Sequence, residues 1–235
     1  MRVIITLCML LFALSASANI WMDDFKGGEL GKDWTPVQWC VGDPEPDWKV
    51  KDGILMGRWP NWDAQMLFLP EYPSLDYTIQ MKCRIDQVMG EPGLAGAGFI
   101  FRSSGPAVKV NGKCIGPLYE LAIGHFQCGF MDADRNGNWF LAGIVVKNHD
   151  LEQWYTLKLV VKGDKFLGYV DGEPICQLSD NKYKGNFVGL MLGSNINASF
   201  DDFMITERVD EQALTDFDVL PADKLAIAWG YVKQK

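Results

Sequence analysis

Several sequence patterns that mark common enzyme classes are missing from this chain. It has only two histidines, His125 and His149, and contains no H-E-x-x-H, G-x-S-x-G or P-loop sequence. Zinc proteases, α/β-type serine hydrolases and P-loop nucleotidases each depend on one of these patterns for their metal ligands, nucleophile or phosphate-binding amides. We therefore expect none of these activities, and we assign both histidines a structural role.

Positive charge is scarce. The chain has 22 Lys and Arg against 30 Asp and Glu, a formal net charge of −8, and its basic residues form no cluster along the sequence. A net-acidic protein without a basic patch does not attract nucleic-acid phosphates or anionic membrane surfaces. The composition therefore argues against nucleic acid as a partner. It does not indicate an oligomeric state.

The one long apolar run lies at the start of the chain. Residues 1–18 combine Arg2, an apolar stretch over residues 3–14 and the A-x-A sequence of residues 16–18, a pattern typical of a secretory signal. The run is shorter than the roughly 20 residues that a membrane-spanning helix needs. We expect a secreted or periplasmic protein without membrane insertion, whose mature chain begins at Asn19.

Cysteines are few and show no metal-binding spacing. Of the six in the chain, five follow the predicted signal: Cys40, Cys83, Cys114, Cys128 and Cys176. No C-x-x-C pair is present, which argues against zinc or thioredoxin-like chemistry. An odd number leaves at least one thiol unpaired, and the sequence does not give the disulfide pairing.

The strongest positive signal is an alternation over residues 75–86. The apolar residues there are Leu75, Tyr77, Ile79, Met81, Cys83 and Ile85, and a polar residue follows each of them. A period of two is typical of a β-strand with one buried face. Similar segments recur along the chain, so we predict an all-β protein, a two-sheet antiparallel sandwich over residues 19–208. Residues 209–235 form a tail in which helical spacing predicts a short amphipathic helix.

Two pairs of aspartates lie near the ends of the predicted domain. Asp23-Asp24 belongs to the first strand and Asp201-Asp202 to the last. If these strands pair, four carboxylates come together and repel unless a cation or hydrogen bonds compensate. We name Asp24 and Asp202 as candidate ligands of a structural calcium ion, the alternative being that each aspartate caps a turn.

A second acidic run, at residues 132–137, matches the first half of a calcium-binding loop. Its twelfth position is Gly143 and not glutamate, and no helical pattern flanks it. The alternative is a hairpin tip built on Asn136-Gly137. We favour this hairpin over a calcium loop.

Candidate ligand-binding residues are aromatic or lie at polar positions of strands. Trp59 and Trp62 flank a proline and either anchor a loop or present flat rings to a sugar. Arg84 is on the polar side of the alternating strand. Arg102 and Glu120 share an outward face if their strands lie in one sheet, as a cross-strand ion pair or as hydrogen-bonding groups for a polyhydroxyl ligand.

The order of several short motifs resembles a known superfamily. These motifs are W-x-V-x-D-G at 48–53, G-F-I-F-R at 98–102, Y-E at 119–120, W-Y-T-L at 154–157, Y-V-D-G at 169–172 and F-D-D-F at 200–203. Together they resemble the concanavalin A-like lectin/glucanase jelly roll, and within it the laminin-G-like and 3-keto-disaccharide hydrolase-type domains. The resemblance implies two curved sheets, a carbohydrate ligand on the concave face near Arg102 and Glu120, and often a structural calcium near Asp24 and Asp202.

One departure from that superfamily bears on catalysis. Its family 16 glucanases carry an E-x-D-x-x-E strand whose carboxylates attack and protonate the glycosidic bond. Here Glu120 is followed by Leu-Ala-Ile, so Glu120 is a catalytic candidate without a named partner. We predict an exported carbohydrate-binding domain. The alternatives are a keto-disaccharide hydrolase-type enzyme that uses Glu120, or a laminin-G-like adhesion module with protein partners.

Overall fold

The fold is taken from a computed structural model of the chain. It describes residues 19–38, 47–60, 64–72, 74–89, 96–105, 108–110, 113–115, 118–124, 128–133, 139–145, 149–193 and 195–209. All regular elements in these ranges are strands, and none of the described residues belongs to a helix long and apolar enough to cross a membrane. The predicted signal, Trp62, the 134–138 hairpin tip and the predicted C-terminal helix lie outside them.

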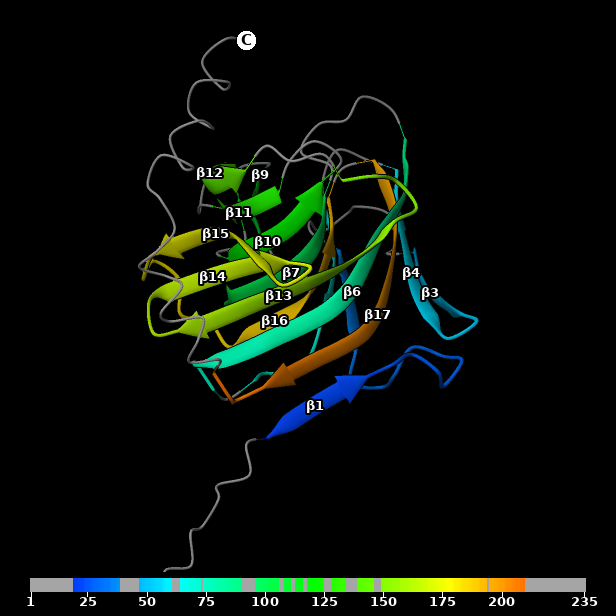
Figure 1. Ribbon diagram of the computed structural model, residues 1–235, viewed down its shortest axis with the longest axis horizontal. Coiled ribbons are helices and arrows are strands. Elements are labelled where there is room, and N and C mark those ends of the chain that lie inside the picture. Colours follow the sequence, from blue (N-terminus) through cyan, green and yellow to red (C-terminus); the bar gives the residue numbers. More distant parts are fainter. Residues whose placement is uncertain are drawn as a thin grey trace, which may run out of the picture.

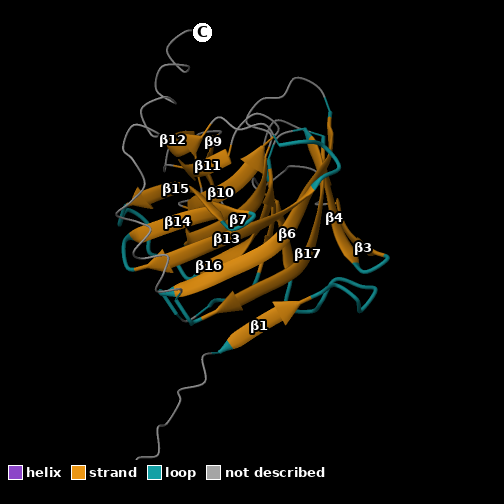
Figure 2. Cartoon of the chain, viewed as in Figure 1, coloured by secondary structure: helices purple, strands orange, loops and turns teal. Residues whose placement is uncertain are grey.

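Two antiparallel sheets pack face to face (Figure 1, Figure 2). Sheet A has the order β15-β14-β13-β6-β17-β4-β3, with β1 also pairing β17. Its strands are β1 Ile20–Asp23, β3 Asp47–Lys51, β4 Ile54–Trp59, β6 Tyr77–Val88, β13 Trp154–Lys162, β14 Lys165–Val170, β15 Glu173–Ser179 and β17 Ile196–Thr206.

Sheet B has the order β12-β11-β10-β7-β16-β5-β2. Its strands are β2 Thr35–Gln38, β5 Gln65–Phe68, β7 Gly96–Ser103, β10 Leu118–Gly124, β11 Cys128–Ala133, β12 Trp139–Val145 and β16 Phe187–Leu192. A separate two-stranded ladder joins β8 Val108–Val110 to β9 Lys113–Ile115.

The alternation of the long strand β6 sets up the core. Its apolar side chains, from Tyr77 through Ile85, are buried between the sheets against residues such as Phe99 and Leu190 of sheet B. Its polar positions, which include Lys82, face the other way. This confirms the prediction of a half-buried strand, because the pleat places successive side chains on opposite faces.

The first and last strands of the domain pair, as the argument about the two aspartate pairs assumed, and a two-residue turn joins β3 to β4. Strand β1 pairs antiparallel with β17, and Asp23 stands opposite Phe203. Asp52 and Gly53 join β3 to β4 with φ values of 54° and 76°. Both values are positive, as a two-residue type I′ hairpin turn requires.

The outer face of sheet B differs from the polar surface that we expected there. A second apolar cluster lies on it, made of Ala64, Met66, Phe68, Ile100, Leu118 and Met191. All six residues are buried. Sheet A instead carries the polar outer surface of the sandwich. The solvent-exposed positions of β3, β4, β6 and β17 lie next to one another there.

Candidate functional site

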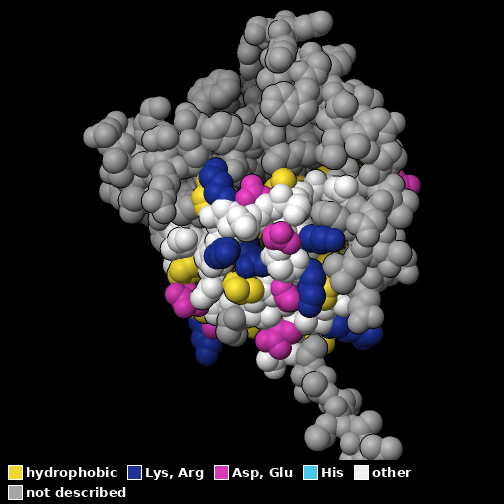
Figure 3. All heavy atoms as spheres, turned by 90° about the vertical axis from the view of Figure 1, so that its left-hand side faces the viewer, with side chains coloured by type: hydrophobic (Ala, Val, Ile, Leu, Met, Phe, Trp, Pro, Cys, Tyr) yellow, Lys and Arg dark blue, Asp and Glu magenta, His cyan; other side chains and the backbone are white. Residues whose placement is uncertain are grey.

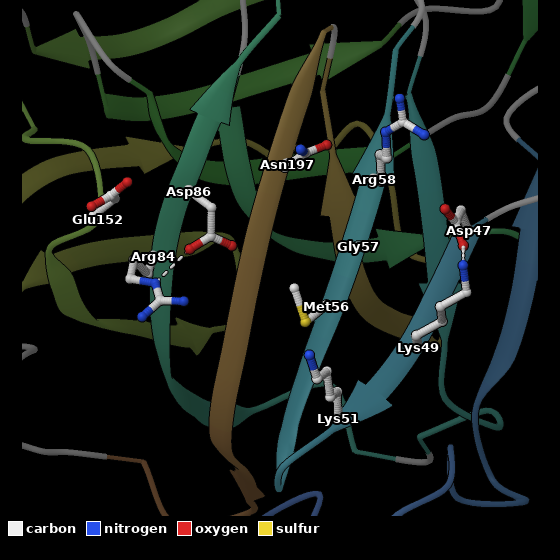
Figure 4. A pocket seen from close by; sticks show the side chains of 10 residues that line it. All are labelled: Asp47, Lys49, Lys51, Met56, Gly57, Arg58, Arg84, Asp86, Glu152 and Asn197. Carbon is white, nitrogen blue, oxygen red and sulfur yellow. Dashed lines mark hydrogen bonds and ion pairs between the residues drawn. The ribbon is translucent and has the colours of Figure 1, made fainter.

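A hollow with a volume of about 670 Å³ lies on the outer face of sheet A (Figure 4). Protein ligand pockets typically have about 300–1,000 Å³. Strands β3, β4, β17 and β6 form it, with one residue from the turn before β13. Its lining residues are Asp47, Lys49, Lys51, Met56, Gly57, Arg58, Arg84, Asp86, Glu152 and Asn197. We call this hollow the sheet A groove.

Arg84 is the most firmly held side chain of the groove. Its Nε donates to Asp86 Oδ1 over 2.5 Å, and one terminal nitrogen donates to Ser199 Oγ over 3.3 Å. Ser199 in turn donates to Asp86 Oδ2 over 2.6 Å. The guanidinium also lies over the indole ring of Trp154, with 4.7 Å from Cζ to the ring centroid.

These contacts follow from strand register. Arg84 and Asp86 are two residues apart on β6, so both point outward. The ladder places Ser199 of β17 opposite Arg84 on one side and Trp154 of β13 opposite it on the other. The guanidinium is therefore fixed from three directions before any ligand arrives.

The remaining groove residues differ in polarity. Asn197 donates from Nδ2 to Gln87 Oε1 over 3.0 Å. Met56 supplies an exposed apolar side chain. Glu152, with φ of 61°, donates its backbone N–H to the Ile85 carbonyl, which holds it at the β6 side of the groove. The groove thus offers charged donors, carboxylate acceptors and one apolar contact.

Arg102 does not share a face with Glu120. Ser103 pairs with Phe187 and Ile100 with Gly189, so Phe101 and Arg102 together face the single residue Val188. This β-bulge, with φ of 54° at Arg102, turns the side chain away from the outer face. Arg102 is 4% exposed and donates to the carbonyls of Leu75 and Gly163, each over 2.7 Å. The guanidinium ties the chain at Leu75 to the turn at Gly163 and does not line the sheet A groove.

Glu120 lies on the outer face of sheet B and has no contact with solvent. Its exposed fraction is 0%, and neither carboxylate oxygen has a hydrogen-bond partner among the described residues. Its ladder partners are Ile100 and Met131. Burial raises the pKa of Glu120 to about 8, because the ionised form loses its hydration. Sequence reasoning placed this residue in an open groove, and the structure places it in an apolar layer.

One of the two tryptophans named from the sequence, Trp59, does not present its ring to solvent. Trp59 is 1% exposed and belongs to the main core, so its ring faces are covered by protein. A buried ring of this kind corresponds to the packed alternative that the sequence left open. Trp62 lies outside the described residues.

Asp24 and Asp202 are each held by a lysine. Lys26 lies 3.0 Å from Asp24, and Lys82 lies 2.7 Å from Asp202. The hydrogen bond from Lys26 keeps the pKa of Asp24 below its ordinary value. No group of three or more potential metal ligands occurs among the described residues. The pairing of the terminal strands does bring the acidic dipeptides together, but lysines rather than a set of oxygen ligands surround these two carboxylates.

Sequence reasoning found Arg84 but missed the residues that hold it. Asp86 carried a usable signal, because it stands two positions from Arg84 on the same strand face. Ser199 and Trp154 carried none, since they are 115 and 70 positions away and meet Arg84 only through the ladder register.

Comparisons with known proteins bear on the fold. No protein-family model matches the sequence, and no curated protein matches it. Among solved structures, a Bacillus subtilis protein of unknown function with a galectin-like fold superposes with a TM-score of 0.60 at 15% identity, over 80% of this chain and 96% of that one. The CBM66 carbohydrate binding module of Bacillus subtilis gives 0.57 at 20% identity, over 74% and 95%. The fold is the concanavalin A-like jelly roll.

A third jelly roll, the β-glucanase of Bacillus licheniformis, gives a TM-score of 0.57 at 11% identity, over 80% of this chain and 98% of that one. These matches confirm the predicted jelly-roll fold. Matches at such low sequence identities show the fold alone. The laminin-G-like subtype therefore stays a prediction.

Proposed function

We propose that this protein is an exported carbohydrate-binding jelly roll that holds a saccharide in the sheet A groove. The observation that carries the proposal is the fixed guanidinium of Arg84, clamped by Asp86, Ser199 and the Trp154 ring at the edge of a hollow. A planar fork of donors suits the hydroxyl groups of a sugar, and a side chain that is already ordered loses little conformational entropy on binding.

The composition of the groove supports the same function. Asp86 and Glu152 supply acceptors for sugar hydroxyls, while Asn197 supplies an amide. Met56 offers an apolar contact for C–H groups. Small-molecule sites combine a few placed polar groups with apolar surface in this way. The fold agrees with this proposal, because one structure that shares it is a carbohydrate binding module.

Hydrolysis is less well supported. Glycosidases use two carboxyl groups that flank the scissile bond. Glu120, the candidate from the sequence, is buried on the opposite sheet from the groove, where a saccharide in the groove does not reach it. Binding without turnover is therefore the function that we propose, with export resting on the predicted signal of residues 1–18.

A binding experiment with matched variants tests the proposal. The purified protein is screened on a glycan array, and its best ligand is titrated by calorimetry against the parent, Arg84→Met and Arg208→Met. Arg208 is an exposed arginine outside the groove and serves as the control. Loss of charge-assisted hydrogen bonds predicts an affinity loss of roughly tenfold or more for Arg84→Met alone.

Three outcomes would overturn the proposal. Unchanged affinity in Arg84→Met would place the ligand elsewhere on the molecule. An array without any bound glycan, together with capture of a defined protein ligand, would favour the adhesion alternative. Release of reducing sugar from the bound glycan would show an enzyme.

A further inference from the structure

Cationic side chains slightly outnumber carboxylates in the sheet A groove, although the protein as a whole is acidic. Four cationic side chains line it, Lys49, Lys51, Arg58 and Arg84, against three carboxylates, Asp47, Asp86 and Glu152. The whole chain has a formal net charge of −8. On the side shown in Figure 3, basic and acidic side chains are likewise interspersed. The groove is therefore a local exception to the overall charge of the molecule.

Two of the four cations are already neutralised by carboxylates. Lys49 lies 2.6 Å from Asp47, and Arg84 lies 2.5 Å from Asp86. Lys51 and Arg58 are exposed, and neither has an ion-pair partner among the described residues. In Figure 4 both stand on the β3–β4 side of the groove, whereas Arg84 and Glu152 stand on the β6 side. The β3–β4 side therefore carries the available positive charge.

We propose that the saccharide bound in this groove is acidic and carries carboxylate or sulfate groups that Lys51 and Arg58 bind. This inference rests on the proposed function. Ammonium and guanidinium groups form their strongest hydrogen bonds with anionic oxygens, and Arg presents a fork that matches both carboxylate and sulfate. In this arrangement Arg84 and Asp86 contact hydroxyl groups, while Lys51 and Arg58 select for charge.

One carboxylate of the groove, that of Glu152, gives a further test of the proposal. Glu152 has the same sign as such a ligand and sits across the groove from Lys51 and Arg58 (Figure 4). Its negative charge weakens the attraction of an anionic saccharide, so Glu152→Gln raises the affinity for acidic glycans. A neutral glycan gains nothing from this change.

An array printed with neutral glycans and with their carboxylated and sulfated counterparts tests the inference. We expect the bound glycans to be acidic, and the two acidic series separate carboxylate from sulfate recognition. The double variant Lys51→Met/Arg58→Met should bind the best acidic glycan about three- to tenfold more weakly, in line with exposed ion pairs. The matched control is Lys32→Met/Arg208→Met, two exposed cations outside the groove.

Added salt and a non-sugar competitor complete the test. Raising NaCl from about 0.02 to 0.5 M should weaken binding of the acidic glycan, because exposed charges are screened over about 10 Å at 0.1 M. Poly-glutamate should not compete, since it lacks the sugar hydroxyls that Arg84 and Asp86 contact. Competition by poly-glutamate, or unchanged affinity of the double variant, would overturn the inference.

The failure of this inference is distinguishable from failure of the proposed function. If the bound glycans are neutral and depend on Arg84 but not on Lys51 or Arg58, the groove is a sugar site without charge selection. If no glycan binds, the carbohydrate function itself is wrong.

Discussion

Arg84 and Trp154 stand directly opposite each other on β6 and β13, and the guanidinium lies over the indole ring. This cross-strand pair fixes the direction of the one arginine that the groove holds from several sides. The ring thus contributes to the site without lining the hollow itself. The arrangement makes the affinity of the groove sensitive to a residue that a ligand need not touch.

Replacing Trp154 tests this relationship. A cation–π contact of this kind is worth about 0.5–1 kcal/mol, so Trp154→Leu should weaken glycan binding about two- to fivefold by freeing the guanidinium. Trp154→Phe keeps a ring and should lose less. Calorimetric titration measures both variants. Equal affinity in Trp154→Leu and the parent would show that the ring does not position Arg84.

Glu120 predicts an unusual dependence of stability on pH. Its pKa is raised from 4.5 to about 8 by burial, so between these values the folded chain keeps a proton that the unfolded chain has lost. The folded state binds more protons, and the free energy of unfolding therefore falls as pH rises through this window, by up to about 1.4 kcal/mol per pH unit.

Glu120→Gln removes this dependence, because glutamine stays neutral. The variant should match the parent near pH 4.5 and exceed it by on the order of 2–5 kcal/mol near pH 8. Urea denaturation at several pH values measures the difference. Glu71→Gln, at an exposed position, is the control and should follow the parent. Parallel curves for Glu120→Gln and the parent would show that the carboxyl is not held protonated in the folded protein.

Arg102 predicts a loss of stability without a loss of binding. Arg102→Met leaves the Leu75 and Gly163 carbonyls without their donor, which should cost about 2–4 kcal/mol in chemical denaturation. The exposed Arg58→Met should change stability little. At a temperature where both variants are folded, Arg102→Met should keep the glycan affinity of the parent. If the folded Arg102→Met variant no longer binds glycan, Arg102 belongs to the ligand-binding site after all.

We expect a chelator to leave the thermal stability of the protein unchanged, because of the contacts that Asp24 and Asp202 make. Lys26 and Lys82 already supply positive charge to Asp24 and Asp202, so thermal unfolding with and without a chelator should give the same Tm. A cation bound only to the folded state would raise stability. A lower Tm in chelator would therefore support the calcium site that the resemblance implied.

The fold was largely accessible from the sequence, because its signals are local. Alternation in β6 and the Asp52-Gly53 turn each depend on a few neighbouring residues. The pairing of β1 with β17 followed from the sandwich architecture. The predicted fold class is confirmed on these grounds, together with the structural matches.

The site was less accessible, because it depends on register. A single bulge opposite Val188 removes Arg102 from the face that strict alternation assigns to it. Glu120 lies on the same face of sheet B as a second apolar cluster, formed by four strands and a residue before β5, which no short segment of the sequence indicates. Among the predicted ligand-binding residues that the structure describes, Arg84 alone lines the sheet A groove, since its place needs nothing beyond the alternation of its own strand.

The antiparallel pairing of β1 with β17 also sets how the domain responds to force. Ile20 stands opposite Thr206 at one end of the ladder. A force that separates these two positions therefore acts on that end and breaks the hydrogen bonds of the ladder one after another. Tension at these two positions would peel β1 away from β17 first and leave in place the ladders that join β6, β17, β4 and β3, the strands of the sheet A groove.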